Sequence, residues 1–168
     1  AWWWPPFVSC APDESRAVHR IVRRYIKTAI GFLAIGLVLG LVSLVQRELG
    51  RSWPSPYQVS AHTHAILVGF VMMMIQGVAL WLFPRPDKED RRYDPRLAEV
   101  AYWCMAIGTA LRLAGESGRI WSQAPLLRAA VVVAGTLQVM GIATFFHTMW
   151  SRVRAVGSAV REAKGERF

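Results

Sequence analysis

Cysteine is scarce in this sequence, which has two among its 168 residues. Cys10 and Cys104 are far apart in the chain, and Cys104 lies inside an apolar stretch. Two such residues cannot make the disulfide framework of a small secreted domain. They also lack the close spacing of thiolate ligands for a metal. The sequence therefore predicts neither kind of site.

Acidic residues are also few, since 11 Asp and Glu stand against 20 Lys and Arg, for a formal net charge of +9. Yet 54% of the residues are hydrophobic. The two values agree if apolar residues form membrane spans and basic residues lie between them. No basic face or stacking platform for bases is evident, so we expect no nucleic acid as a partner. The first residues, AWWWPPF, lack the basic-then-apolar order of a signal peptide.

Long apolar stretches predict an all-α integral membrane protein with four transmembrane helices preceded by a basic interfacial helix. The Trp/Pro-rich start and the surface helix occupy residues 1–27, and a basic tail occupies residues 152–168. GESGR, at 115–119, is interpreted as a turn. The transmembrane domain covers residues 28–151, with spans at about 28–46, 57–83, 97–114 and 129–151.

Basic residues are distributed unevenly along this predicted topology. They crowd into the segments before the first span, between the second and third spans, and after the fourth span. The connections near Arg47 and Arg119 hold few of them. Because cytoplasmic segments carry an excess of Lys and Arg, both termini are expected in the cytoplasm. The expected location is a bacterial inner (cytoplasmic) membrane, with the lipid bilayer as the first partner.

Two histidines, His62 and His64, lie near the start of the second span. An ionisable residue inside a span is a functional-site hypothesis, and imidazole is a common ligand of haem iron and copper. Residues two apart on a helix lie roughly 200° apart, so the two rings face opposite sides. A histidine here could instead cap the helix or bond to a neighbouring helix.

The residues below each histidine favour His62 as the metal ligand. Its face continues through Gly69, where a flat macrocycle could lie against the backbone, and then through Met73 and Gln76. These three are the predicted cofactor-binding residues. The face of His64 is uniformly aliphatic, as a lipid-facing or packing surface would be, so His64 is the second choice as a ligand.

The two remaining histidines are weaker candidates as metal ligands. His147 is expected near the opposite edge of the membrane from His62, at a depth that differs by roughly 15 Å. Axial ligands of one iron must lie much closer together, so His62 and His147 cannot share a haem. His19 belongs to the polar face of the predicted surface helix.

The stretch HTHAILVGF…ALWLFPR resembles the second helix of the catalytic subunit (subunit I) of haem–copper oxidases, most closely the cbb-type and nitric-oxide-reductase-like branch. On that pattern the family's low-spin haem ligand falls on His62. The resemblance implies a haem b protein that transfers electrons or binds a small gas within a membrane complex. The alternatives are a structural subunit of a respiratory or photosynthetic complex without a cofactor, and copper held by His62 or His64.

The sequence also departs from this family. The full catalytic subunit has twelve helices, and neither the histidine pair of its high-spin haem nor an H-P-E-V-Y-like copper motif is present here. No catalytic residue is predicted, and we do not expect the chain alone to reduce oxygen.

The resemblance also bears on assembly, because the oxidase subunit looks like three four-helix arcs about a pseudo-threefold axis. One arc would lack a closed core for a macrocycle. We therefore expect a homo-oligomer, trimer or dimer, or association with other membrane subunits. Four glycines offer contact surfaces: Gly36, Gly40, Gly135 and Gly141.

Overall fold

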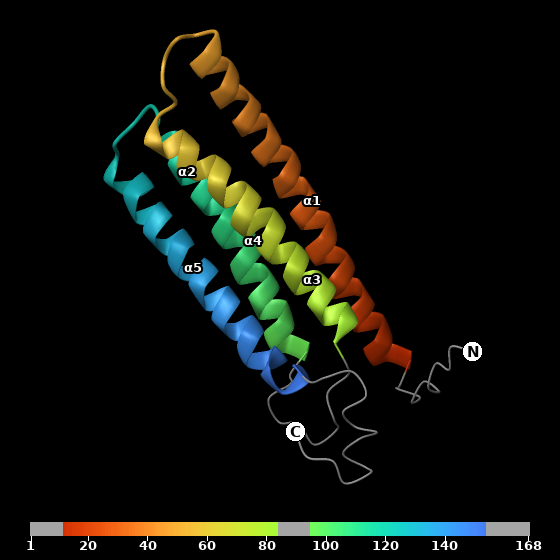
Figure 1. The fold of residues 1–168 in the computed structure, drawn as a ribbon. Coiled ribbons are helices and arrows are strands. Elements are labelled where there is room, and N and C mark those ends of the chain that lie inside the picture. Colours follow the sequence, from red (N-terminus) through yellow and green to blue (C-terminus); the bar gives the residue numbers. More distant parts are fainter. Residues whose placement is uncertain (1–11, 84–94, 154–168) are drawn as a thin grey trace, which may run out of the picture.

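The computed structural model describes residues 12–83 and 95–153, which form four helical rods (Figure 1). All four rods contain a segment long and apolar enough to cross a membrane. This confirms the predicted all-α membrane fold. The helices are α1 (Pro12–Glu48), α2 (Pro56–His64), the π-helix η1 (Ala65–Met72), α3 (Met73–Leu82), α4 (Pro95–Gly118), α5 (Pro125–Met149) and the 3₁₀ turn η2 (Trp150–Arg152).

The rods run antiparallel, and α2, η1 and α3 together make the second one (Figure 1). We call the end with connections 49–55 and 119–124 the hairpin end, and the end where α1 begins and α5 stops the terminal end. The predicted spans fall on α1, on α2–η1–α3, on α4 and on α5. The basic stretch and the first span are one uninterrupted helix, because no proline or glycine breaks α1 near Lys27.

Each of the four rods begins at a proline. Proline suits the first helical position because that residue needs no backbone N–H donor and its φ angle is already helical. At the second rod the hydroxyl of Ser55 also accepts a hydrogen bond from the backbone N–H of Gln58, at 3.2 Å. The α4 helix continues through Gly118, so the predicted turn at GESGR starts later than expected, at residue 119.

The π-helix keeps one face of the second rod turned toward the core. Ala61, Ala65, Gly69 and Met73 follow one another at steps of four and are all buried. In an α-helix three such steps would carry the stripe roughly 120° around the axis. A π-helical turn holds more residues, so the stripe stays aligned. The aliphatic face below His64 was predicted to face lipid or to pack, and most of it is exposed: Leu67, Val71, Ile75, Val78 and Leu82. Val68, on the same predicted face, is partly buried against the core.

Glycines allow the rods to approach closely. A Cβ atom on Gly36 would lie 2.5 Å from Cδ1 of Ile66, and one on Gly141 would lie 2.9 Å from Cγ of Met105. Gly40 meets His62, and a Cβ on Gly135 would lie 3.1 Å from Nη1 of Arg112. Gly36, Gly40 and Gly141 therefore contact side chains of the same chain, whereas Gly135, half-buried beside Arg112, stays a candidate for contact with another copy.

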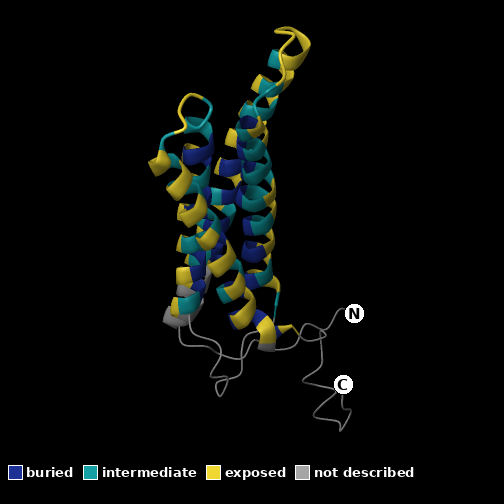
Figure 2. Ribbon diagram, turned by 90° about the vertical axis from the view of Figure 1, so that its left-hand side faces the viewer, coloured by how far each residue is buried: buried dark blue, intermediate teal, exposed yellow. Residues whose placement is uncertain are grey.

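A closed core fills the terminal end of the bundle. Tyr25 is fully buried, and its ring packs edge-on against Tyr102 at 5.1 Å and Phe145 at 6.4 Å between centroids. Helices α1, α4 and α5 meet at this point, and Gly77 brings α3 against Tyr25. Figure 2 shows buried residues along the inner sides of the rods, while the last turns of α1 extend past the others and are exposed. One copy therefore has a hydrophobic core at this end, and side chains fill it.

Arg152, the first residue of the predicted basic tail, is buried at the terminal end, with 5% of its surface exposed. Its Nη2 atom donates to the carbonyl oxygens of Phe83, at 3.0 Å, and Leu80, at 3.3 Å. The last carbonyls of a helix have no partners within it, so a cationic donor there satisfies them and suits the helix dipole. Arg152 thereby joins the end of α5 to the end of α3.

Replacing Arg152 by alanine is expected to lower the free energy of unfolding by about 2–3 kcal/mol, because buried carbonyls lose a charged donor. The measurement is thermal unfolding of the purified protein in mild detergent. Arg24→Ala is the matched control, because the Arg24–Glu99 ion pair is about half exposed on both sides and should contribute at most about 1 kcal/mol. Equal losses in the two variants would contradict the capping role.

Candidate functional site

His62 lies between the first two rods, in contact with α1. Its Nδ1 atom is 2.8 Å from the carbonyl oxygen of Gly36. The ring lies over Gly40, where an added Cβ would be 2.8 Å from the imidazole Cε1 atom. The histidine is half-buried, and the absence of a side chain at position 40 makes room for it.

The contact with Gly36 fixes the tautomer of His62. A carbonyl oxygen can only accept a hydrogen bond, so Nδ1 must carry the proton and donate it. The lone pair is then on Nε2. Metal-bound histidines commonly have this arrangement, in which the nitrogen away from the metal donates to a backbone carbonyl. His62 therefore has the ring orientation and the Nδ1 proton that a ligand through Nε2 requires. The same hydrogen bond also joins two helices, which was the other role considered for a histidine at this position.

His64 lies on the other side of the rod, against α4. Its Nδ1 atom is 2.8 Å from the carbonyl oxygen of Ser60 and 3.7 Å from Oε2 of Glu116. The Ser60 hydroxyl donates to Oε1 of Glu116 at 2.7 Å, and Nε of Arg112 donates to the same oxygen at 3.0 Å. Glu116 is 3% exposed. His64 thus belongs to a buried polar cluster rather than to the aliphatic face below it.

Sequence reasoning missed this cluster of Ser60, His64, Arg112 and Glu116. In the sequence Arg112 falls near the end of the third predicted span, and Glu116 falls in the predicted turn at GESGR. One signal was available, because residues 60 and 64 and residues 112 and 116 are each four apart and so share a helix face. Which faces meet could not be read from the sequence. Nearby, Nη2 of Arg119 donates to the Tyr57 hydroxyl at 2.8 Å.

The predicted cofactor-binding residues lie deeper in the bundle than His62. Gly69 packs against Phe32 of α1, whose Cγ would be 2.7 Å from a Cβ at that position. Met73 and Gln76 are fully buried. Gln76 lies roughly 20 Å along the rod from His62 at the usual helical rise. The structure therefore groups these three residues with the core, and His62 with Gly36 and Gly40.

The other two histidines are separate from this site. His147 follows Phe145, which packs at the level of Tyr25 and Gly77, so it lies about 15 residues, or roughly 20 Å, along the bundle from His62. It is exposed, beside Trp150. The side chain of His19 lies outside the described residues.

A family model described as Cytochrome C and Quinol oxidase polypeptide I matches residues 20–163. The chain belongs to this family. As a member of the oxidase polypeptide I family it is a multi-pass membrane protein, and membership implies haem as the general class of cofactor. Comparisons with curated proteins and with solved structures gave no match.

The described part of this oxidase polypeptide I member holds no group of three or more His, Cys, Asp or Glu side chains that could bind a metal ion. Cys104 is a free, half-buried thiol. A metal bound at His62 would therefore take its other ligands from a cofactor such as a porphyrin, from residues outside 12–83 and 95–153, or from another chain.

Three glutamines are buried in the described bundle, and two of them, Gln58 and Gln138, are hydrogen-bonded through their side chains. Nε2 of Gln138 donates to the hydroxyl of Thr109 at 3.2 Å. Both polar atoms of Gln76, and the Tyr25 hydroxyl, are buried without a hydrogen-bond partner among the described residues. A buried polar group without a partner carries the full cost of leaving water, about 1–3 kcal/mol.

The substitution Gln76→Leu is therefore expected to raise the melting temperature, because it removes an unpaired amide and keeps a similar volume. The matched control is Gln138→Leu, which should lower the melting temperature because it leaves the Thr109 hydroxyl without its donor. Both are measured by thermal unfolding in the same detergent. A loss of stability in Gln76→Leu as large as in the control would show that Gln76 has a partner in the native protein.

Proposed function

We propose that this chain is a haem-b-binding membrane protein that transfers electrons or binds a small gas within a membrane complex. His62 is the proposed axial ligand, through Nε2. The observation that carries the proposal is the 2.8 Å bond from Nδ1 of His62 to the carbonyl of Gly36, in a chain of the oxidase polypeptide I family. This bond gives the ring the tautomer and the orientation that an axial ligand needs.

The residues around His62 fit one axial bond. Gly40 leaves the imidazole ring free of steric conflict with α1. A bound haem would supply a one-electron redox centre or an iron site for a gas. The chain's own contribution would be to orient the ring and to raise the basicity of Nε2 through the hydrogen bond to Gly36.

The proposed contacts of Gly69, Met73 and Gln76 with the cofactor remain a prediction. In the described bundle these residues pack against α1 and the core, so a macrocycle could reach Gly69 only if the ring of Phe32 moved away. We therefore base the proposal on His62 and give these three residues a secondary role.

A second axial ligand would come from outside this bundle. His64 is directed toward Glu116, and His147 lies near the terminal end. A second copy of the chain or another subunit could supply the missing ligand, so we retain the proposal of a homo-oligomer, dimer or trimer, or of a larger membrane complex. Native mass spectrometry in mild detergent distinguishes these assemblies from a haem-loaded monomer, which would exclude a shared site.

The substitution His62→Ala is expected to abolish haem binding, because the proposed axial imidazole is lost. His147→Ala should leave haem binding unchanged, and His64→Ala should reduce it far less than His62→Ala. The measurement is the absorption spectrum of the purified protein, where a Soret band with sharp reduced α and β bands reports haem. Full haem occupancy in the His62 variant would exclude the assignment.

The same spectrum separates the alternatives. A colourless protein that copurifies with other membrane subunits would favour a structural subunit without a cofactor. Copper by elemental analysis, lost in either His62→Ala or His64→Ala, would favour a copper site at the hairpin end.

We also propose that the chain lies in a bacterial inner membrane with its terminal end in the cytoplasm. The support is the excess of Arg and Lys in the segments at that end, which include Arg85, Lys88 and Arg91 in the connection between α3 and α4. His62 would then lie near the periplasmic face.

Cysteine labelling tests this orientation. In a background without Cys10 and Cys104, Asp90→Cys should resist a membrane-impermeant thiol reagent added from the periplasmic side. Ser122→Cys, in the exposed connection at the hairpin end, is the matched position and should label readily. The reverse pattern would invert the orientation and the depth proposed for His62.

A further inference from the structure

A groove of about 490 Å³ lies between α4 and α5 on the outside of the bundle. Val132 and Val139 on its wall are 69% and 67% exposed, so the groove faces the lipid. Its lining is apolar except for one threonine and one arginine. The residues that line it are Arg112, Val131, Val132, Gly135, Thr136, Val139 and Met140.

Arg112 reaches from α4 into this groove. Its Nε atom bonds to Glu116, and its Nη1 atom lies 3.1 Å from where a Cβ of Gly135 would be. Position 135 has no side chain, so the guanidinium can lie against α5. The Thr136 hydroxyl donates its proton to the carbonyl of Val132, at 3.0 Å. Within the described residues, Glu116 is the acceptor bonded to Arg112, and its bond uses Nε and leaves the Nη donors open to the groove.

This position is unfavourable for a cation that faces lipid tails. Gly135 is seven residues from Arg128, and Arg112 is seven from Arg119, so the guanidinium lies roughly 10 Å below these charged residues. A donor in hydrocarbon without an acceptor costs several kcal/mol. Glu116 offsets the charge, but the remaining donors need an oxygen acceptor that reaches this depth.

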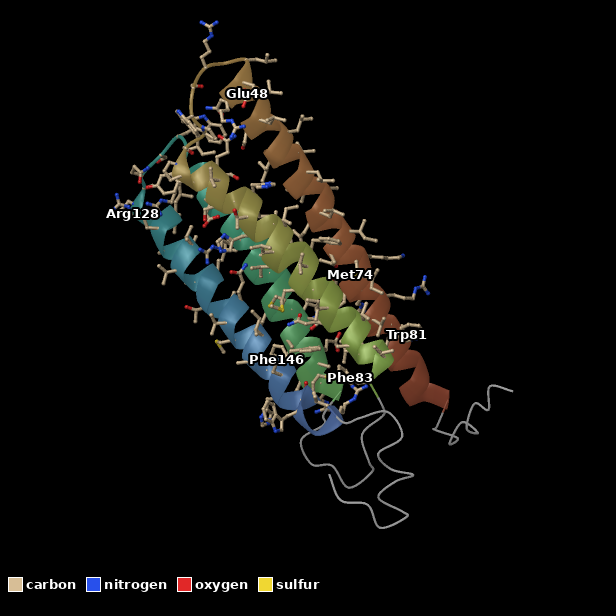
Figure 3. The ribbon with its side chains drawn as sticks, viewed as in Figure 1. Glu48, Met74, Trp81, Phe83, Arg128 and Phe146 are labelled. Carbon is tan, nitrogen blue, oxygen red and sulfur yellow. The ribbon has the colours of Figure 1, made fainter. Side chains whose placement is uncertain are left out.

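A second cation lies directly above the groove. Arg128 is three and four residues before Val131 and Val132, so it shares their face of α5, one turn nearer the hairpin end. It is exposed, and Figure 3 shows it on the outside of the bundle near the start of α5. The groove is thus apolar along its length, with one arginine at its mouth and another within it.

We propose that this groove binds a phospholipid with an anionic headgroup, such as phosphatidylglycerol. The phosphate meets Arg128 at the membrane interface, an ester oxygen accepts from Arg112, and an acyl chain lies along Val132, Val139 and Met140. Cationic residues near a membrane surface attract anionic lipids in this way. The acyl chain fills the apolar part of the groove, and the ester group supplies the acceptor that Arg112 needs.

Charge complementarity favours a lipid over a second copy of the chain. Residues 20–83 and 96–153 contain three acidic side chains: Glu48, Glu99 and Glu116. Glu48 and Glu99 are in ion pairs with arginines of their own chain, and Glu116 is buried. No described acid is therefore available to a neighbouring copy's Arg112, whereas a phospholipid brings ester and phosphate oxygens as acceptors.

The test is native mass spectrometry of the delipidated full chain, titrated with phosphatidylglycerol and, separately, with phosphatidylcholine. Wild-type protein should bind phosphatidylglycerol at least about fivefold more tightly. Arg128→Gln should lower that affinity about fivefold, which corresponds to about 1 kcal/mol for one arginine near the surface. Gly135→Leu should weaken both lipids, because its side chain fills the groove.

Two control variants match these changes. Arg51→Gln removes an exposed arginine at the same end of the bundle but away from α5, and Val133→Phe adds bulk to α5 outside the groove. Both should bind lipid as wild type does. Melting curves check that Gly135→Leu is folded. If it is not, the proposal is tested by comparing the phosphatidylglycerol affinities of Arg128→Gln and Arg51→Gln.

Three results would each overturn the proposal. They are equal affinity for the two lipids, an Arg51→Gln loss as large as that of Arg128→Gln, and a lipid-free dimer that Gly135→Leu dissociates. The last would assign the groove to a second copy of the chain.

Discussion

Close approach of helices at glycine is the constraint on which this bundle depends. Between lipid-exposed helices there is little hydrophobic driving force, so association relies on van der Waals contact and hydrogen bonds. Gly36, Gly40, Gly69 and Gly77 all lie where α1 meets the second rod, and a Cβ on any of them would come within 3.0 Å of a neighbouring side chain. Gly141 has the same role between α5 and α4. Only hydrogen at these positions allows the contacts.

The same close approach produces the candidate ligand site. His62 can reach the carbonyl of Gly36 because α1 has no side chains at positions 36 and 40. The tautomer of the histidine is therefore a consequence of packing between two helices. The packing in turn gains a hydrogen bond, and ionisable side chains inside membranes almost always have such a partner. A larger residue on α1 would displace the ring and change both. Structure and proposed chemistry depend here on one contact.

Polar groups away from this contact are arranged by depth. Near the hairpin end the buried carboxylate of Glu116 accepts hydrogen bonds from Ser60 and Arg112, and His64 lies beside it. At the terminal end Arg152 satisfies the last carbonyls of α3. Gln76 lies between the two ends without a described partner. The charged groups of the bundle interior thus lie in its hairpin half and at its terminal end, and partners offset the cost of desolvation.

The sequence by itself determined the four spans and the lipid-facing stripe of the second rod, because long apolar runs and their periodicity follow from single residues and the thickness of a bilayer. It also indicated His62 as the favoured ligand. It could not give the partners of His62 and Glu116 or the contacts that Gly36, Gly40 and Gly141 make within the chain. It also missed the burial of Arg152. Those depend on which faces of different helices meet, and a π-helix in the second rod shifts that alignment. Only the packed tertiary structure decides them. The local pattern of a segment does not tell which distant segment it meets, as in the contacts His62–Gly36 and Ser60–Glu116, whose residues are 26 and 56 apart in sequence.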